Sequence, residues 1–140
     1  MEFTHAFYDA LPPEAAAIRQ AVFVEEQGFQ EEFDAIDRHA LHLLLFADGR
    51  SVGTLRAFTE DGGTRWHIGR VAVIKSARQL HLGRRMMDLA EAELRRRGAA
   101  GVEVSAQCRV QPFYEKCGFT PVGEVYLDEF CPHIRMVKEL

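Results

Sequence analysis

Cysteine is scarce in this sequence of 140 residues and is not arranged as a metal site or a disulfide framework requires. The cysteines are Cys108, Cys117 and Cys131, and no CxxC pair occurs. Neither a zinc ribbon nor a disulfide scaffold is indicated. His39 and His42 have poor ligand spacing and no third partner. We therefore expect no metal and, from the reduced thiols, a cytoplasmic location.

Long hydrophobic runs and an excess of positive charge are also missing. No apolar run approaches the roughly 20 residues that span a bilayer. The first residues, MEFTHAFYDAL, lack the basic start and apolar core of a signal peptide. The formal net charge of −4 provides no basic field for non-specific nucleic-acid binding. We expect neither a membrane nor a nucleic acid among the partners.

Apolar residues, in contrast, are plentiful enough for a packed core. They make up 47% of the chain, against 27% charged residues, which is ordinary for a soluble protein. No internal repeat, low-complexity tract or linker interrupts the sequence. Residues 1–140 are therefore expected to form one domain.

Charge is distributed unevenly along the chain. Acidic residues gather between positions 25 and 37, and basic residues gather between positions 78 and 97. Such an asymmetry suits an anion site in the middle of the chain and a cationic ligand near the acidic segment. Two solvated faces are the simpler explanation of a charge run taken alone.

The first half of the sequence predicts an antiparallel meander. Three strand-like runs are joined by tight turns, of which Asp48-Gly49 is the clearest hairpin signal. A further strand comes first, followed by a helix that starts at Pro12-Pro13 and ends at Gly28. The expected strands are residues 2–8, 41–47, 51–58 and 64–74, and the acidic stretch 30–38 is expected to be a loop with room for a short helix.

The second half predicts a β-α-β crossover. From Leu82 to Arg97 apolar residues recur at helical spacing, and Gly98 is a natural residue to end that helix. The strands before and after it should be parallel. The elements that follow are a strand at 101–106, a helix at 111–118 and strands at 119–127 and 133–140. The prediction is a mixed α/β fold with a mostly antiparallel sheet of about six to seven strands and flanking helices.

The segment RVAVIKSARQLHLGRRMM, residues 70–87, is the most informative stretch. A strand ends near Ile74 and a helix begins near Gly83. The free N–H groups at a helix start attract anions, and Arg78 and Arg84 can add charge-assisted bonds to phosphate. By itself the pattern also fits a strand-to-helix turn that binds nothing.

Two motifs in the right order resemble a known family. RVAV, then Arg78-x-x-x-x-Gly83 and an amphipathic helix, is similar to motif A of the GNAT acyltransferases, whose loop holds the pyrophosphate of acetyl-CoA. AQCRVQPFYEKCGFTPVGE, residues 106–124, resembles motif B of the same family. The segments at 18–29 and 131–140 also have counterparts. The resemblance covers nearly the whole chain and suggests the small bacterial stand-alone subgroup.

The resemblance implies how acetyl-CoA, the expected cosubstrate, would bind. The loop would hold the pyrophosphate, and the preceding strand and motif B would contact the pantetheine arm. The implied residues are Val71, Val73, Arg78, Gln79, Leu80, His81, Leu82, Gly83, Arg84, Phe113 and Lys116. The family's loop usually has glycine where this sequence has His81, and often where it has Gln79. An imidazole there could crowd the diphosphate, turn outward, or donate to phosphate when protonated.

The implied chemistry is direct acyl transfer to an amine through a tetrahedral intermediate. The N–H of Val73 is the candidate oxyanion donor. Tyr114 is the candidate general acid, because a phenol with a pKa of about 10 can protonate a departing thiolate; plain aromatic packing is the alternative. Glu26, Asp34 and His133 are the candidate general bases, Glu26 first, and a water chain would also suffice.

The expected function is therefore that of an acetyl-CoA-dependent N-acetyltransferase acting on a small-molecule or peptide amine. The acceptor is expected to contact Glu25, Glu26, Asp34 and His133. One alternative is a non-catalytic acyl-CoA-binding or regulatory module, which the altered loop at 79–81 favours. Another is a binding protein that has lost the cofactor. The resemblance also allows a homodimer, and neither the acceptor nor the acyl chain length can be read from the sequence.

Overall fold

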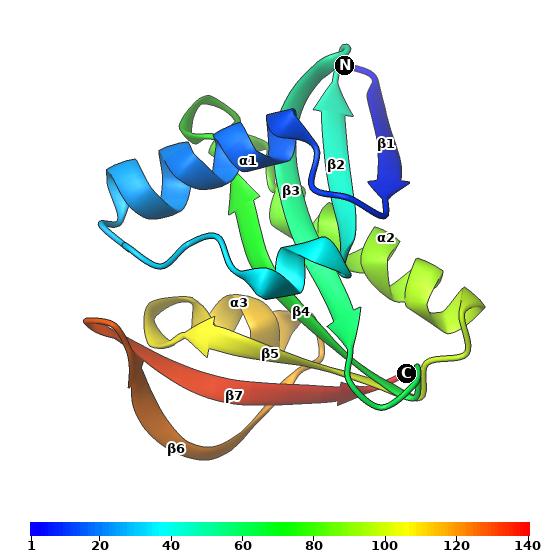
Figure 1. The fold of residues 1–140 in the computed structure, drawn as a ribbon, viewed down its shortest axis with the longest axis vertical. Coiled ribbons are helices and arrows are strands. Elements are labelled where there is room, and N and C mark those ends of the chain that lie inside the picture. Colours follow the sequence, from blue (N-terminus) through cyan, green and yellow to red (C-terminus); the bar gives the residue numbers. More distant parts are fainter.

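The computed structural model describes residues 1–140 as one seven-stranded sheet with helices on both faces (Figure 1). The strand order is β1-β2-β3-β4-β5-β7-β6. Only β4 and β5 pair in parallel, and every other neighbouring pair is antiparallel. The mixed, mostly antiparallel sheet that the sequence predicts is confirmed.

Strands β2 (Leu41–Ala47), β3 (Arg50–Thr59) and β4 (Arg65–Val73) form the expected three-stranded meander, and β1 (Phe3–Tyr8) pairs with β2 at the edge of the sheet. Asp48 and Gly49 connect β2 to β3 with φ angles of 49° and 84°. A two-residue hairpin turn of this kind needs positive φ at both central positions, and Asp-Gly tolerates that conformation.

The second half follows the predicted order of elements. Helix α2 (Leu82–Arg96) carries the chain from β4 to β5 (Gly101–Gln107), and α3 (Gln111–Lys116) precedes β6 (Thr120–Asp128) and β7 (Cys131–Glu139). Short 3₁₀ turns occupy Lys75–Leu80 and Cys108–Val110. None of the helices has the length and apolar character that crossing a membrane would take.

The helix predicted between Pro12-Pro13 and Gly28 is not uniform. Helix α1 is regular over Pro13–Arg19, and the chain then continues as a π-helix over Gln20–Glu26. Gly28, with φ 84°, follows its end. A π-helix leaves no signature in an apolar period of 3.6 residues, so the sequence could not predict it. The acidic stretch 30–38, expected to be a loop with room for a short helix, contains a 3₁₀ turn at Ala35–Arg38, capped by Asp34.

Both faces of the sheet are buried, as β2 illustrates. Leu43 and Leu45 belong to the larger core beneath α2, whereas Leu44 belongs to the core beneath α1. Side chains alternate along a strand, so a strand covered on both faces is apolar at every position. The run LHLLLFA, in which the buried His42 is the one polar residue, therefore marks an interior strand of the sheet.

The parallel pair β4–β5 separates toward its carboxyl end. Pairing runs from Arg65 opposite Gly101 to Ile68 opposite Val104 and then stops, although both strands continue. Beyond that point β4 has one extra residue relative to β3, and Arg70 has a left-handed φ of 53°. This β-bulge bends β4, and the two strands diverge in Figure 1.

The first prediction concerns Gly53, where β3 passes under α2. A Cβ at Gly53 would lie 2.8 Å from Met86 Sδ and 3.3 Å from the carbonyl oxygen of Ala72. Met86 is fully buried, so relief requires repacking. We expect Gly53→Ala to lower the free energy of unfolding by about 1–3 kcal/mol in urea denaturation. The control is Gly69→Ala, where a Cβ meets nothing within 4 Å; equal losses would contradict the explanation.

Candidate functional site

Two cavities lie near the carboxyl end of β4. The first, here called the splay cavity, has a volume of about 150 Å³ and lies between the diverging ends of β4 and β5. The second, here called the loop cavity, has a volume of about 450 Å³ and lies at the start of α2. Val71 and Tyr114 line the splay cavity, and Val73 and Phe113 line the loop cavity. The two cavities are therefore neighbours along β4 and α3.

The loop cavity brings together most of the residues expected to bind the cofactor. Its lining contains eight of those eleven, namely Val73, Arg78, His81, Leu82, Gly83, Arg84, Phe113 and Lys116. Four of them are basic, and they surround the N-terminus of the 15-residue helix α2. Backbone N–H groups without intrahelical partners and the helix dipole add to this positive field. The lining therefore has the charge and the backbone donors that an anion site requires.

The other three expected cofactor residues lie outside the loop cavity. Val71 lines the splay cavity. The Gln79 side chain donates a hydrogen bond of 3.0 Å to the carbonyl of Ser76, within the 3₁₀ turn. Leu80 packs against the larger hydrophobic core. The structure therefore gives Gln79 and Leu80 roles within the protein.

His81 keeps the backbone conformation that a glycine would adopt there. It immediately precedes α2 with φ 56° and ψ 43°, in the left-handed region. Residues with a Cβ adopt this region at a cost, although histidine does so more often than most. The side chain is exposed and lines the loop cavity. Gly83 is needed for another reason, because a Cβ there would lie 3.1 Å from the Phe113 ring.

The N–H of Val73 points toward the side of β4 on which pairing with β5 has ended. Gly53 and Val73 are opposite each other, and the Ile74 N–H donates to the Val52 carbonyl at 2.9 Å. In an antiparallel ladder that pattern makes Gly53 and Val73 a non-hydrogen-bonded pair, whose own N–H groups point away from the partner strand. Pairing with β5 has already ended at Ile68. The candidate oxyanion donor is therefore free of both neighbouring strands.

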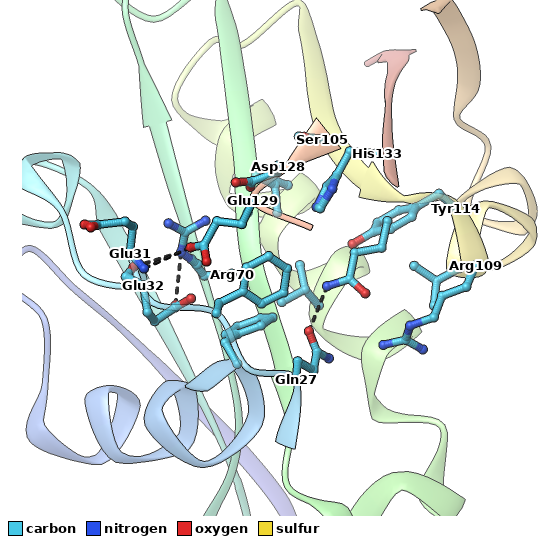
Figure 2. Close-up of a pocket in the computed structure, with 17 residues that line it drawn as sticks. Gln27, Glu31, Glu32, Arg70, Ser105, Arg109, Tyr114, Asp128, Glu129 and His133 are labelled. Atoms are coloured by element: carbon cyan, nitrogen blue, oxygen red, sulfur yellow. Dashed lines mark hydrogen bonds and ion pairs between the residues drawn. The ribbon is translucent and has the colours of Figure 1, made fainter. Parts of the chain in front are cut away.

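Tyr114 is held rigidly beside the splay cavity. It is 8% exposed, and its ring contacts Phe113 and Phe119 edge to face at centroid distances of 5.0 and 5.8 Å. Figure 2 shows its hydroxyl pointing toward the middle of the cavity, and no hydrogen bond within the protein occupies it. Burial raises the pKa of the Tyr114 phenol above its ordinary value of 10. The group thus keeps its proton and presents it to the cavity.

His133 offers an acceptor to the same cavity. Its Nδ1 lies 2.9 Å from the carbonyl oxygen of Cys131. A carbonyl can only accept, so Nδ1 carries the proton and Nε2 of the neutral ring has the free lone pair. The ring is 5% exposed and packs against Tyr126 and Phe29. Its position and tautomer are therefore set by the fold.

Glu25 and Glu26 are not brought to the splay cavity. Glu25 is exposed and lines neither cavity. Glu26 pairs with Arg78 at 2.8 Å, and the Arg78 Nε also donates to the Val73 carbonyl at 3.1 Å. Glu26 therefore connects the end of the π-helix to the anion loop.

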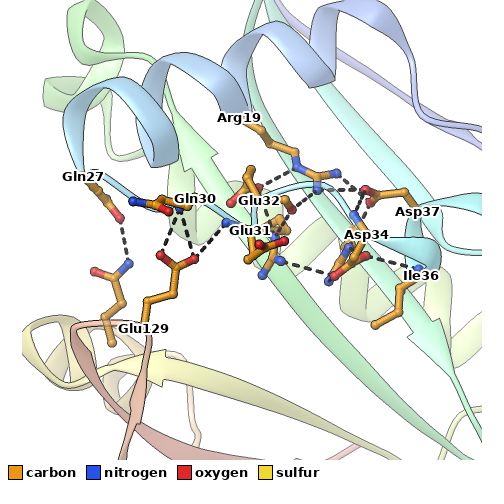
Figure 3. Close-up of polar contacts among 12 residues, drawn as sticks. Arg19, Gln27, Gln30, Glu31, Glu32, Asp34, Ile36, Asp37 and Glu129 are labelled. Carbon is orange, nitrogen blue, oxygen red and sulfur yellow. Dashed lines mark hydrogen bonds and ion pairs between the residues drawn. The ribbon is translucent and has the colours of Figure 1, made fainter.

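Asp34 belongs to a network of ion pairs beneath the cavity (Figure 3). Three arginines from α1, β3 and β4 meet three carboxylates from the acidic segment. The members are Arg19, Glu32, Asp34, Asp37, Arg56 and Arg70, at distances from 2.7 to 3.4 Å. The acidic segment was expected to attract a cationic ligand. The chain's own arginines already neutralise much of it.

Glu32 lines the splay cavity together with Arg70 of the same network. Arg19 Nε and Arg70 Nε both pair with its Oε2, at 2.9 and 3.0 Å. The carboxylate is only 4% exposed, and its side-chain contacts are with these two arginines. Burial raises the pKa of Glu32, opposed by Arg70 and Arg19. Nothing in the sequence distinguished Glu32 from the other acids of its run.

The β6–β7 turn closes the splay cavity from the far side. The carboxylate of Glu129 accepts hydrogen bonds from the backbone N–H groups of Gln30 and Glu31, at 3.0 and 2.9 Å (Figure 3). Phe130 of the same turn stacks on Phe29 at 5.1 Å. Segments about a hundred positions apart in the sequence thus share one wall, which sequence patterns could not indicate.

Comparison with known proteins identifies the family. A model of the acetyltransferase (GNAT) domain matches residues 9–140, well over half of the chain. The chain belongs to the GNAT acetyltransferase family. The resemblance carried by the two motifs is confirmed, and the loop cavity lies where motif A meets motif B.

Relatives of this GNAT protein match it over nearly their whole length. The uncharacterized N-acetyltransferase YjcF of Bacillus subtilis is 32% identical over 129 residues, covering 90% of this chain and 91% of YjcF. A solved acyl-CoA N-acyltransferase from Pseudomonas aeruginosa is 32% identical, with a TM-score of 0.81 and 98% of each chain covered. Escherichia coli ElaA is 28% identical, with a TM-score of 0.83 and 99% of each chain covered.

The ion network of this GNAT domain predicts how stability depends on acidity. Burial raises the pKa of Asp37, but hydrogen bonds from Arg19 and Arg56 outweigh it and hold that pKa at about 2, below the ordinary 3.8. Stabilisation from a lowered pKa is present above about pH 4 and is lost as the pH falls through 2. It amounts to about 2 kcal/mol.

We expect Asp37→Asn to flatten the acid part of the profile, since asparagine does not titrate. The free energy of unfolding in urea, measured from pH 7 to pH 2, checks this. At neutral pH the variant should be less stable by about 3 kcal/mol, because two buried arginines lose a partner. Glu32 contributes a pH dependence of stability of the opposite sign, because its raised pKa favours the folded state at low pH. An unchanged acid slope in Asp37→Asn would refute the assignment.

A third prediction tests the strain at His81 in this GNAT loop. Glycine adopts the left-handed conformation freely, but it also gains entropy in the unfolded chain. We expect His81→Gly to raise the free energy of unfolding by up to about 1 kcal/mol. The control His81→Ala removes the imidazole and keeps the Cβ, and it should not stabilise. Thermal unfolding distinguishes them, and equal stability of the two variants would exclude strain.

Proposed function

We propose that this protein transfers an acetyl group from acetyl-CoA to an amine by direct attack. The observation that carries the proposal is that two unlike cavities are neighbours along β4, and that Val73, whose N–H is free of both neighbouring strands, lines the loop cavity. The loop cavity is basic, and the splay cavity presents a proton donor and a proton acceptor. The similar P. aeruginosa protein is named an acyl-CoA N-acyltransferase, which supports the same chemistry here.

Acetyl-CoA fits the loop cavity by charge and by the position of its lining residues. Arg78, Arg84, Lys116 and the start of α2 would hold the phosphates, with His81 beside them. The pantetheine arm would follow the free edge of β4 toward Val73. When bound, acetyl-CoA supplies an activated thioester carbonyl.

The protein groups then divide the work of acyl transfer. The Val73 N–H would stabilise the oxyanion as the amine nitrogen bonds to the carbonyl carbon. Breaking of the carbon–sulfur bond releases a thiolate, and Tyr114 would supply its proton. The proton lost by the amine would pass to Nε2 of His133. We assign the base role to His133 because Glu26 and Asp34 are ion-paired outside the cavity.

The fourth prediction tests this division of labour at Tyr114. Removing the phenol proton should lower kcat by about a hundredfold or more, since general acid catalysis contributes that much. Free thiol released from acetyl-CoA in the presence of amines measures kcat. The affinity for acetyl-CoA should not change in Tyr114→Phe. The control is Tyr8→Phe, a half-exposed tyrosine on β1 at the other edge of the sheet.

Binding without turnover would favour the alternative of a non-catalytic acyl-CoA-binding module, to which His81 in the loop gives some support. Acetyl-CoA at about 100 times its Kd should stabilise the protein by roughly 2.7 kcal/mol. A clear thermal shift with no thiol release from any amine would establish that module. The absence of both a thermal shift and thiol release would reject both functions.

A further inference from the structure

Arg78 of the loop cavity is held by a carboxylate from a distant segment. Both oxygens of Glu26 lie close to Arg78 Nη2, at 2.9 and 2.8 Å, although the two residues are 52 positions apart. The other arginine of the cavity, Arg84, pairs with Asp88 of its own helix at 3.4 Å. The charge that Arg78 would offer to a phosphate is therefore already neutralised by a remote part of the protein.

Arg78 also covers a backbone group on the free edge of β4. Its Nε donates a hydrogen bond of 3.1 Å to the carbonyl oxygen of Val73. Because Val73 and Gly53 form a non-hydrogen-bonded pair, this carbonyl points away from β3, as the Val73 N–H does. The pantetheine arm would follow the same edge. In the free protein Arg78 thus occupies an acceptor on that path, and Glu26 holds it there.

The Glu26 end of this contact adjoins the splay cavity. Glu26 is the last residue of the π-helix Gln20–Glu26. The next residue, Gln27, lines the splay cavity and accepts a hydrogen bond of 2.8 Å from the side chain of Gln107 on β5 (Figure 2). Consecutive residues at the end of the π-helix therefore contact the anion loop and form part of the wall of the splay cavity.

We propose that Glu26 is an internal competitor of the acetyl-CoA phosphates: it holds Arg78 in the free protein, acetyl-CoA displaces it, and the end of the π-helix is released. The inference rests on the proposed function and goes beyond it by assigning an autoinhibitory contact. A guanidinium binds phosphate and carboxylate in the same way, so one anion replaces another. Both side chains are partly exposed, and such a pair is weak enough for a ligand to displace.

The affinity for acetyl-CoA, measured by calorimetry, tests the competition. Glu26→Gln should bind acetyl-CoA about two- to fivefold more tightly than the wild type, because no carboxylate has to leave Arg78. The control Glu25→Gln removes the neighbouring exposed charge, which lines neither cavity, and it should change the Kd less. Unchanged or weaker binding in Glu26→Gln would overturn the inference, and weaker binding would make Glu26 a residue that positions Arg78 for phosphate.

A double-mutant cycle distinguishes competition from a general effect of charge. In Arg78→Ala the carboxylate of Glu26 no longer has this arginine to withhold from the ligand. Adding Glu26→Gln to that variant should therefore leave the Kd of acetyl-CoA unchanged. An equal gain in affinity with and without Arg78 would show that Glu26 repels the ligand directly, and it would overturn the inference.

Amide hydrogen exchange tests the release of the π-helix end. The N–H groups of Gln27 and Gly28 donate to the carbonyls of Val22 and Val24, at 3.2 and 3.0 Å. These two amides should exchange several-fold faster in free Glu26→Gln than in the free wild type. Acetyl-CoA should accelerate their exchange in the wild type and have little effect in the variant. Equal exchange in the two free proteins would contradict the release.

Inorganic pyrophosphate separates this inference from the proposed function, because it carries the anion without the thioester. It should rank the wild type and Glu26→Gln as acetyl-CoA does. Tighter binding of both ligands by Glu26→Gln, without thiol release from any amine, would retain the competition and reject acyl transfer. Thiol release with equal affinity in the two proteins would reject the competition alone. Binding of neither ligand by any variant would reject both.

Discussion

The end of pairing between β4 and β5 is the constraint on which the rest of the structure depends. The two parallel strands stop pairing at Ile68 and Val104. Beyond that point β4 has backbone groups without a partner on the β5 side, and a space opens between the two strands. The bulge at Arg70 bends β4 away. Without this separation the Val73 N–H would meet a neighbouring strand, and no cavity would lie beside it.

The ion network explains how the gap between β4 and β5 keeps a fixed geometry. Arg70 leaves the bulge and pairs with Glu32 and Asp34, while Arg19 and Arg56 tie the same acidic segment to α1 and β3. Breaking either pair of Arg19 would leave a buried charge without its partner. The network therefore anchors the segment that lines the splay cavity. Two of its members, Glu32 and Arg70, line that cavity.

Local patterns predicted most of the fold and nearly all of the loop cavity. The strands and α2 have strong periodicity, and Asp48-Gly49 and Gly98 set turns through their own backbone preferences. The loop cavity is built from two continuous stretches that meet at Gly83 and Phe113, so neighbours in sequence remain neighbours in space. The π-helix and the bulge were missed because neither alters the spacing of apolar residues.

The sequence alone therefore determined the order of the elements, the mixed sheet, the family and the basic loop, because each depends on residues close together in the chain. Only the tertiary structure decided the second half of the site. It paired Asp34 and Glu26 with arginines, turned His133 so that Nε2 is free, and brought Glu32 to Tyr114's cavity. Those outcomes depend on which distant charges meet, and linear spacing carries no information about that.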